Sequence, residues 1–251
     1  MKELQNILFE FPEIKLEEMD RTKLMDRVDT KFAFHRDQLP EIIKDLKTHF
    51  HVLEVDNKRI SQYESLYFDK SEFDFYKDHH NNKNHRFKVR FRKYVDSGLH
   101  FLEVKEKRKG RMVKRRVPVK KFEHELSNSS KSFVEQYLKD EDELVPKLWN
   151  QYQRITFVNK ELNERLTFDI NLEFKWGEEE KKFPSLVIAE LKQERKNRNS
   201  PFYKLMRLKG IRPYRISKYC IGAIELYDTR NLKYNRFKKK LLKLKKINNA
   251  T

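Results

Sequence analysis

The sequence predicts an α+β fold in which a closed antiparallel β-barrel or tunnel of about eight strands encloses a basic lumen, with helices packed outside. Three observations lead to this prediction. Several segments alternate charged and apolar residues with the period of two that a β-strand requires. Their charged positions are rich in arginine, and the chain carries a net charge of +18. Their apolar positions are aromatic and aliphatic, so they need cover, which several amphipathic segments can provide.

An open sheet with its charged face in water is the alternative to a barrel. A wetted face would mix Lys, Glu, Thr and Ser, whereas here arginine dominates with an occasional carboxylate. A closed barrel also removes the unpaired edges of the sheet. The barrel is therefore the preferred prediction, and its lumen would present guanidinium groups to the oxygens of a phosphate chain.

The first fifty residues predict three helices and one strand. Leu4, Ile7, Leu8 and Phe11 share one helical face, and Pro12 ends that helix. The strand alternates charged and apolar residues, and the third helix carries an apolar stripe. The expected ranges are 2–11, 16–26 and 37–50 for the helices and 27–34 for the strand.

The middle of the chain predicts a strand, a polar loop and a three-stranded meander. Its clearest strand places Arg86, Lys88, Arg90 and Arg92 on one face and apolar residues on the other. Turn signals separate the strands of the meander. The expected ranges are 59–68 for the first strand, 69–85 for the loop, and 86–94, 99–107 and 111–119 for the meander.

The remainder of the chain predicts a helix, three strands, two helices and a tail dominated by Lys and Arg. We expect one tunnel domain over residues 1–228, including the N-terminal helix, and a basic tail over residues 229–251. This tail is either solvated or docked on an anionic membrane or polyanion. The other expected ranges are 130–148, 201–209 and 216–226 for helices, and 152–157, 165–172 and 185–193 for strands.

Composition excludes several kinds of site. Cys220 is the single cysteine, which excludes an internal disulfide and a cysteine-based zinc cluster. The chain has only 5 glycines, and neither of the glycine-rich phosphate-binding motifs, G-x-x-x-x-G-K and G-x-G-x-x-G, occurs in it. Side chains must therefore hold any bound phosphate. No apolar run is long enough to span a membrane, and the acidic N-terminus lacks the layout of a signal peptide. We expect a cytoplasmic protein, with the inner face of the membrane as a further location reached through the tail.

Several short motifs follow one another in a fixed order along the predicted strands. Lys31 lies in the first alternating strand, and Ser217-Lys218-Tyr219 lies at the start of the last predicted helix. Between them lie Arg90-x-Arg92, Glu103-x-Lys105, Tyr152-x-Arg154, Arg165 with Asp169, and Glu190 within Ile188-Ala189-Glu190-Leu191-Lys192. In this order the chain resembles the catalytic domain of the vacuolar transporter chaperone (VTC) polyphosphate polymerases in their bacterial form. That family belongs to the triphosphate tunnel metalloenzymes, and the similarity covers residues 20–228.

The resemblance implies a role for each motif. The residues expected to neutralise and align phosphates are Lys31, Arg90, Arg92, Lys105, Arg154, Arg165 and Lys218. Tyr152, Ser217 and Arg116 are expected to bind the substrate, although Arg116 could also be a rim charge. Glu190 is expected to hold a divalent metal, Mn²⁺ or Mg²⁺.

The implied activity is an ATP-dependent polyphosphate polymerase that transfers the γ-phosphate to a growing inorganic polyphosphate chain. One departure favours the polymerases over the hydrolases of the superfamily: Arg27-x-Asp29-x-Lys31 stands in place of Glu-x-Glu-x-Lys. The alternatives are a metal-dependent tri- or polyphosphatase and a non-enzymatic polyphosphate-binding module. Most Phe residues lie opposite the cations, which argues against nucleic acid. The expected partners are ATP, polyphosphate, and a membrane surface or membrane protein at the tail.

Overall fold

The computed structural model describes residues 2–20, 28–109, 111–138, 143–161, 163–228 and 232–250. Its main feature is an antiparallel sheet whose path runs in the order β2-β11-β9-β8-β4-β5-β6-β7. In that order the strands span Val28–His35, Leu186–Gln193, Glu164–Trp176, Leu144–Asn159, Ser61–Lys70, Arg86–Tyr94, Leu99–Arg108 and Arg111–Val119. Three short strands lie off this path, namely β1 (Glu13–Ile14), β3 (Phe50–Leu53) and β10 (Glu179–Phe183).

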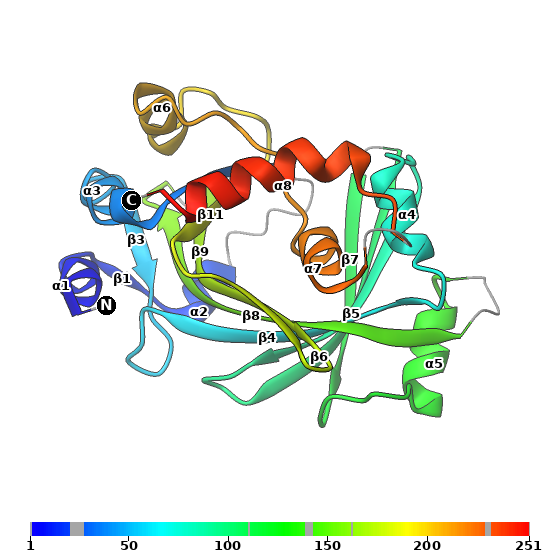
Figure 1. The fold of residues 1–251 in the computed structure, drawn as a ribbon. Coiled ribbons are helices and arrows are strands. Elements are labelled where there is room, and N and C mark those ends of the chain that lie inside the picture. Colours follow the sequence, from blue (N-terminus) through cyan, green and yellow to red (C-terminus); the bar gives the residue numbers. More distant parts are fainter. Residues whose placement is uncertain are drawn as a thin grey trace.

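The sheet curls around a hollow but does not close (Figure 1). The prediction of a closed barrel is therefore wrong, because β2 and β7 end the path and no ladder joins them in the described ranges. The reason lies beside β2. The Tyr214 backbone N–H donates to the Lys31 carbonyl at 2.6 Å, and α8 (Asn235–Asn248) also packs against β2. The segment before α7 and α8 thus occupy the position that β7 would need, and the sheet remains a curled half-barrel.

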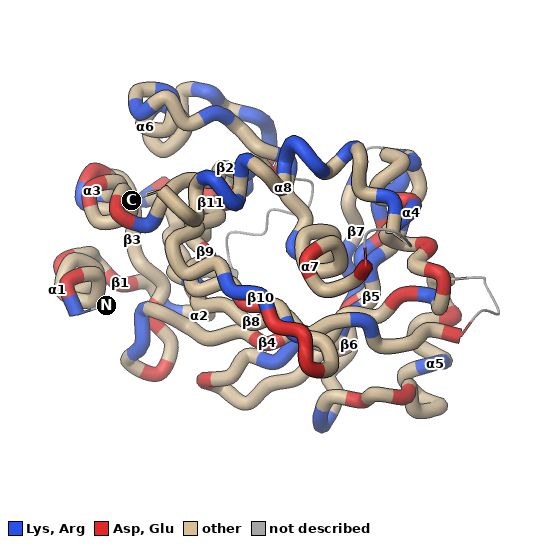
Figure 2. The backbone as a smooth tube through the Cα atoms, viewed as in Figure 1, with Lys and Arg blue, Asp and Glu red and all other residues tan. Residues whose placement is uncertain are grey.

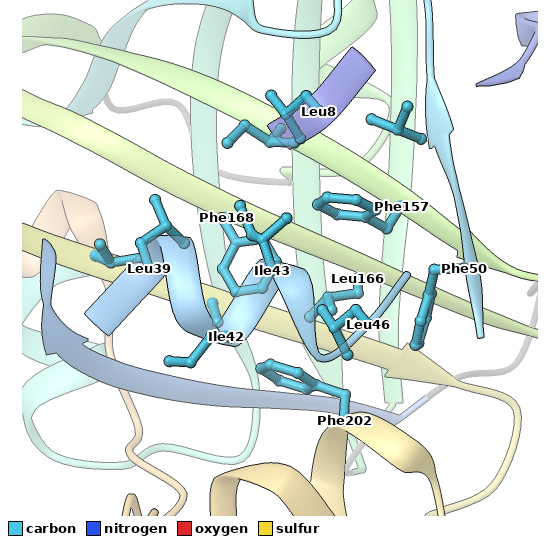
Figure 3. Packing of buried hydrophobic residues seen from close by; sticks show 14 of the residues in the cluster. Leu8, Leu39, Ile42, Ile43, Leu46, Phe50, Phe157, Leu166, Phe168 and Phe202 are labelled. Carbon is cyan, nitrogen blue, oxygen red and sulfur yellow. The ribbon is translucent and has the colours of Figure 1, made fainter. Parts of the chain in front are cut away.

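We call the face of the sheet that carries Arg90 and Arg92 the inner face, and the opposite face the outer face. Phe32, Phe157 and Phe168 on the outer face are buried under α1 (Lys2–Phe9), α3 (Leu39–Lys44) and α6 (Pro201–Leu208). Figure 3 shows this packing, in which the aromatic rings of the strands meet the leucine and isoleucine side chains of the helices. Each fully buried side chain of this size contributes about 1.5–3 kcal/mol to folding. The alternating sequence pattern correctly predicts this covered face.

A second outer cluster covers the meander. Phe91, Leu102 and Val104 pack against α4 (Asp74–His80) and the region of α5 (Asn128–Glu135). Two short helical segments, α2 (Leu16–Asp20) and η1 (Arg36–Gln38), complete the periphery. The outer face is therefore largely apolar where the helices cover it, which leaves most of the charged residues of the strands to the inner face.

Helix α7 (Lys218–Leu226) lies in the hollow of the sheet, and α8 lies across it (Figure 1). Almost every side chain of α7 is buried, in a cluster that also includes Phe237, Leu241 and Leu244 of α8. The basic tail is consequently a docked helix with its apolar stripe turned to the protein, and not a solvated segment. Figure 2 shows basic positions along the length of this helix.

Several predicted ranges differ from the observed elements. The expected loop at 69–85 contains α4, because the Asp69 carboxylate accepts from the Phe75 and Tyr76 backbone N–H groups at 2.9 and 3.0 Å. The expected helix at 130–148 ends at Glu135, and β8 begins at Leu144. Strands β3 and β10 were not predicted. Residues 21–27 lie outside the described residues, so the predictions for the end of the second helix and for Arg27 stay untested.

Within the described residues no helix is long and apolar enough to cross a bilayer.

The close approach of α7 to the sheet predicts an unusual effect of a glycine substitution. A Cβ at Gly222 would lie 2.5 Å from Cδ1 of the buried Phe174 ring. Gly222→Ala should therefore lower the free energy of unfolding by about 1–3 kcal/mol through overpacking, although the same change in an open helix would stabilise it by about 1 kcal/mol. Urea denaturation followed by circular dichroism measures the change.

Phe174→Leu supplies the control for this prediction. In the Phe174→Leu background the cost of Gly222→Ala should shrink, because the shorter side chain leaves room for the added methyl group. An unchanged or higher stability of the single variant Gly222→Ala would show that α7 does not pack tightly on β9.

Candidate functional site

The register of the meander places cations side by side on the inner face. Lys88 of β5 lies opposite Lys105 of β6, and Lys105 lies opposite Lys114 of β7. In the next row Arg86 lies opposite Lys107. Like charges directly opposite one another destabilise a sheet unless an anion lies between them. This part of the inner face is therefore suited to an anionic ligand.

One carboxylate already lies among these cations. Arg90 donates to Glu103 Oε2 through Nε at 2.8 Å and Nη2 at 2.6 Å, and Lys114 Nζ donates to Glu103 Oε1 at 3.2 Å. Burial opposes the charge of Glu103, but Arg90, Arg92 and Lys105 outweigh it and hold its pKa well below the ordinary value. Arg90 also donates to the Tyr67 hydroxyl at 2.9 Å. Its guanidinium is thus fixed in orientation before any ligand binds.

A second carboxylate joins the sheet to α7. Arg154 on β8 makes a two-pronged ion pair with Asp169 on β9, at 2.6 and 2.8 Å, and Lys218 at the start of α7 donates to the same carboxylate. Burial opposes the charge of Asp169, but Arg154 and Lys218 lower its pKa below the ordinary value. Asp169 therefore positions one cation from the sheet and one from the helix at the same point.

Glu190 is the third carboxylate, and it also lies between cations. Its two oxygens are 3.5 Å from Lys31 Nζ and 3.3 Å from Lys192 Nζ. Across the ranges described, no group of three or more His, Cys, Asp or Glu side chains is arranged to hold a metal. A divalent ion prefers several oxygen ligands that are not already paired with ammonium groups. Glu190 therefore does not hold a divalent ion by itself in this arrangement, and an ion here would also need oxygens of a bound phosphate, so we assign no step to one.

Arg92 is held by hydroxyl groups instead of a carboxylate. Its Nε is 3.3 Å from Ser65 Oγ, and its Nη2 donates to the Tyr152 hydroxyl at 2.8 Å. The Tyr152 ring stacks on Tyr63 with centroids 5.3 Å apart, and Arg92 lies over both rings. Neutral partners leave the charge of a buried guanidinium largely uncompensated, so an anion would bind here favourably.

Two lysines have a similar environment. Burial, together with Lys31 and Arg86, lowers the pKa of Lys88 to about 8. Burial and Arg90 lower the pKa of Lys105 well below its ordinary value. Lys88 Nζ donates to Ser217 Oγ at 3.0 Å, which ties β5 to the first turn of α7. Both shifts have the direction expected of lysines crowded by other cations.

The structure brings most of the sequence-predicted residues together. The inner face carries Lys31, Arg90, Arg92, Lys105, Tyr152, Arg154, Arg165 and Glu190, and the start of α7 adds Ser217 and Lys218. Arg165 lies toward one end, where its Nη2 donates to the Met19 carbonyl at 3.3 Å. Arg116 is exposed on β7 and stacks on Phe101 at 4.5 Å, which is the rim position given as its alternative.

Sequence analysis missed Tyr67 and Lys192 as members of the site. Tyr67 shares its strand face with Ser65 and stacks on Tyr219 of α7 at 5.3 Å. Lys192 is two residues from Glu190, so the period of two places both on one face. The alternation already placed Lys192 on the face of Glu190 without assigning it to the site, whereas the role of Tyr67 depends on the position of α7.

Comparisons with known proteins identify the family but not the activity. A family model described as the VTC domain matches residues 26–227. No curated protein matches the chain. Among solved structures, a Hippeastrum protein described as having a dominant triphosphatase activity has a TM-score of 0.49 and 14% identity, over 78% of this chain and 94% of its own.

Two further solved structures are similar at the same level. A Vibrio parahaemolyticus protein named as a candidate adenylate cyclase has a TM-score of 0.45 and 13% identity, over 76% of this chain and 94% of its own. A conserved hypothetical protein from Pyrococcus furiosus has a TM-score of 0.43 and 13% identity, over 77% of this chain and 99% of its own. At these identities and scores the similarity does not bear on activity.

The environment of Asp169 predicts a stability that depends on pH. The pKa of Asp169 is lower in the folded chain than the ordinary 3.8. The ionised carboxylate therefore stabilises the fold fully above pH 3.8, and this contribution is lost as the pH falls from 3.8 toward the lowered pKa. Asp169→Asn should lower the free energy of unfolding by about 3–5 kcal/mol at pH 7, because it leaves buried cations unpaired. Urea denaturation at pH 7 and at about pH 3 measures the difference.

The same experiment contains its own control. Asp45→Asn removes an exposed carboxylate and should change the stability at pH 7 little. The difference in the free energy of unfolding between the parent protein and Asp169→Asn should be smaller at about pH 3 than at pH 7. An equal difference at both pH values would contradict the assignment of a lowered pKa to Asp169.

The pKa of Lys88 predicts that anion binding takes up protons. With a pKa of about 8, Lys88 is partly neutral in the free protein above that pH, and a bound phosphate would favour its charged form. The affinity for inorganic triphosphate should therefore fall as the pH rises from 7 to about 9. Calorimetry in buffers of different ionisation enthalpy measures both affinity and proton uptake.

Lys88→Arg is the matched variant, since an arginine keeps its charge over this range. Its affinity for triphosphate should depend less on pH, and it should take up fewer protons. If Lys88→Arg retained the full pH dependence of the parent protein, the titrating group would lie elsewhere.

Proposed function

The chain belongs to the VTC domain family, and from that premise we propose that it is a polyphosphate polymerase that transfers the γ-phosphate of ATP to inorganic polyphosphate. The observation that carries this proposal is a set of cations on the inner face for which the described part of the chain supplies no carboxylate partner, namely Arg92, Lys88 and Lys105. They adjoin three carboxylates, Glu103, Asp169 and Glu190, that already lie between other cations. The surplus of positive charge supports a polyanionic substrate.

The proposed reaction needs positioning and charge, and not a general base. An oxygen of the terminal phosphate of the chain attacks the γ-phosphorus, and the bond from that phosphorus to the β,γ-bridging oxygen breaks, releasing ADP. The attacking oxygen is already anionic, so no proton has to be removed. Arg92 and Lys105 would align the phosphates from the sheet, and Lys218 would approach from α7. Fixed cations of this kind stabilise charge in transit without reorganising.

A tri- or polyphosphatase of the same fold is the second candidate. The resemblance leaves this alternative open, because cations that bind a phosphate chain for transfer would also bind it for hydrolysis. Hydrolysis would need a group that orients or activates water, and Glu103, Asp169 and Glu190 are each paired with cations. This pairing favours transfer over hydrolysis. The metal requirement implied by the resemblance stays a prediction, as does the metal role of Glu190.

The partner predicted for the tail is restricted by the docking of α8. Phe237, Leu241 and Leu244 are buried against the protein, so they are not available for insertion into a lipid surface. A membrane contact, if the tail makes one, would rest on the exposed basic face of α8. The membrane partner therefore stays a prediction, and the side chains available for it are the basic residues of α8 and the exposed Leu242.

Arg92→Ala tests the proposed polymerase. It should lower ATP-dependent polyphosphate synthesis by about 10²-fold or more, because it removes a fixed cation aimed at the phosphates. The circular dichroism spectrum should not change, since the partners left behind are the hydroxyls of Ser65 and Tyr152. Chain-length gels with ATP and Mn²⁺ or Mg²⁺ measure synthesis, and phosphate release in the same samples measures hydrolysis.

Arg115→Ala is the matched control, because Arg115 lies on the outer face of β7 and pairs with Glu106 at 3.1 Å. It should leave synthesis unchanged. Phosphate release without chain growth in the parent protein would favour the phosphatase. The absence of both activities would favour a binding module.

A further inference from the structure

Aromatic side chains gather at the end of the inner face where β4 begins and β5 ends. Tyr63 on β4 lies opposite Tyr94 on β5 and Tyr152 on β8. Phe101 on β6 lies opposite Arg92, and directly opposite residues share one face of a sheet. The phenylalanines of the strands mostly pack on the outer face, whereas this inner group consists mainly of tyrosines. We call Tyr63, Tyr94, Phe101 and Tyr152 the aromatic cluster.

The rings of the aromatic cluster contact one another in sequence. Tyr152 stacks on Tyr63 with centroids 5.3 Å apart, and Tyr63 lies 5.0 Å from Tyr94. Tyr94 meets Phe101 edge to face at 5.8 Å. Tyr152 and Tyr63 are buried, whereas Tyr94 and Phe101 are half-buried. The cluster therefore has one end fixed in the interior and one end partly open to solvent.

Packing of the core does not account for the open end. Phe101 belongs to none of the apolar clusters formed by the described residues. Besides Tyr94, its ring contacts the Arg116 guanidinium, which lies 4.5 Å from the ring centroid. Leu99 lies opposite Tyr94, and its side chain is 55% exposed. Half-buried rings beside an exposed leucine at the edge of a charged face are typical of a binding surface.

The buried end of the aromatic cluster lies against cations of the site. Arg92 lies over Tyr63 and Tyr152 at 5.4 and 5.8 Å, and Arg154 lies over the same two rings at 5.2 and 5.3 Å. Tyr94 is two residues beyond Arg92 on β5, which corresponds to about 7 Å along the strand. In a nucleotide the ribose separates the base from the phosphates by a comparable distance. A nucleotide whose phosphates contact Arg92 would therefore place its base beside Tyr94.

The chemistry of the open end matches a base better than a phosphate. An inorganic phosphate chain is charged along its whole length and gains nothing from aromatic rings, whereas a planar base stacks on them. We propose that Tyr94 and Phe101, with Arg116 at the rim, form a subsite for the base of a nucleoside triphosphate. This subsite rests on the proposed function for its nucleotide, but not on the transfer step. Every base has a flat face, so the subsite would accept nucleotides with different bases.

The test compares two probes by calorimetry at fixed ionic strength. One is a β,γ-imido analogue of ATP, which cannot transfer its γ-phosphate, and the other is inorganic triphosphate. Tyr94→Ala should weaken binding of the analogue by about tenfold, because stacking on one ring is lost. Phe101→Ala should have the same effect. Binding of triphosphate should change by less than about twofold, because Arg92 and Arg154 lie over other rings.

Two further variants serve as controls. Tyr94→Phe keeps the ring and should bind both probes as the parent protein does. Phe87→Ala removes a half-buried ring from the outer face of the same strand, where it contacts Phe75, and should affect neither probe.

The outcomes separate the base subsite from the proposed activity. Equal loss for both probes in Tyr94→Ala, or no loss for the analogue, would overturn the subsite. A tenfold loss for the analogue in Tyr94→Phe or in Phe87→Ala would also overturn it, because the effect would not come from the ring at this position. If the loss is specific to the analogue in a protein that makes no polyphosphate from ATP, the subsite stands and the polymerase proposal fails.

Discussion

The cations of the inner face are partly buried, and this burial constrains every other part of the molecule. Cations on the inner face of the half-barrel repel one another strongly, because the interior screens charge less than water does. Two kinds of contact offset this repulsion. Carboxylates lie between pairs of cations at Glu103, Asp169 and Glu190. Tyrosine rings and hydroxyls hold Arg90 and Arg92. The positive charge that these contacts leave uncompensated is available to a polyanion, and the proposed function depends on that remainder.

Helix α7 links this electrostatic problem to the fold. Its first turn brings Ser217 to Lys88 and Lys218 to Asp169, while the rest of the helix is apolar and fills the hollow. Tyr219 donates to the Asp69 carboxylate at 2.5 Å, and the same carboxylate caps α4. Helix α7 therefore fixes Ser217 and Lys218 beside the charged side chains of the sheet, and its apolar residues fill the rest of the hollow. The open edge between β2 and β7 is a consequence, since α7 and α8 supply the cover that closure would otherwise give.

Pairing of the carboxylates also bears on the chemistry. A hydrolase of this shape would need a group to orient the attacking water. The carboxylates Glu103, Asp169 and Glu190 are each paired with cations in the observed arrangement. The proposed transfer to an anionic phosphate needs no general base, because its nucleophile is already deprotonated.

The residues alone were sufficient to predict the strands of the inner face and which charged side chains lie together on it. Alternation with a period of two places Arg90 with Arg92, and Glu190 with Lys192, on one face of a strand whatever the surrounding fold. The motif order was sufficient to predict the family, which the family model confirms over residues 26–227. These features are local, so short stretches of sequence carry them.

Long-range contacts decided the rest. Closure of the sheet depends on what lies beside β2, and the docking of α7 and α8 there could not be inferred from the alternation of any strand. The contacts of Glu190 with Lys31 and of Tyr67 with Tyr219 join segments far apart in the chain. The local sequence pattern decides which face of the sheet a side chain occupies. The curvature of the sheet and the docking of α7 decide which charged side chains meet across the hollow.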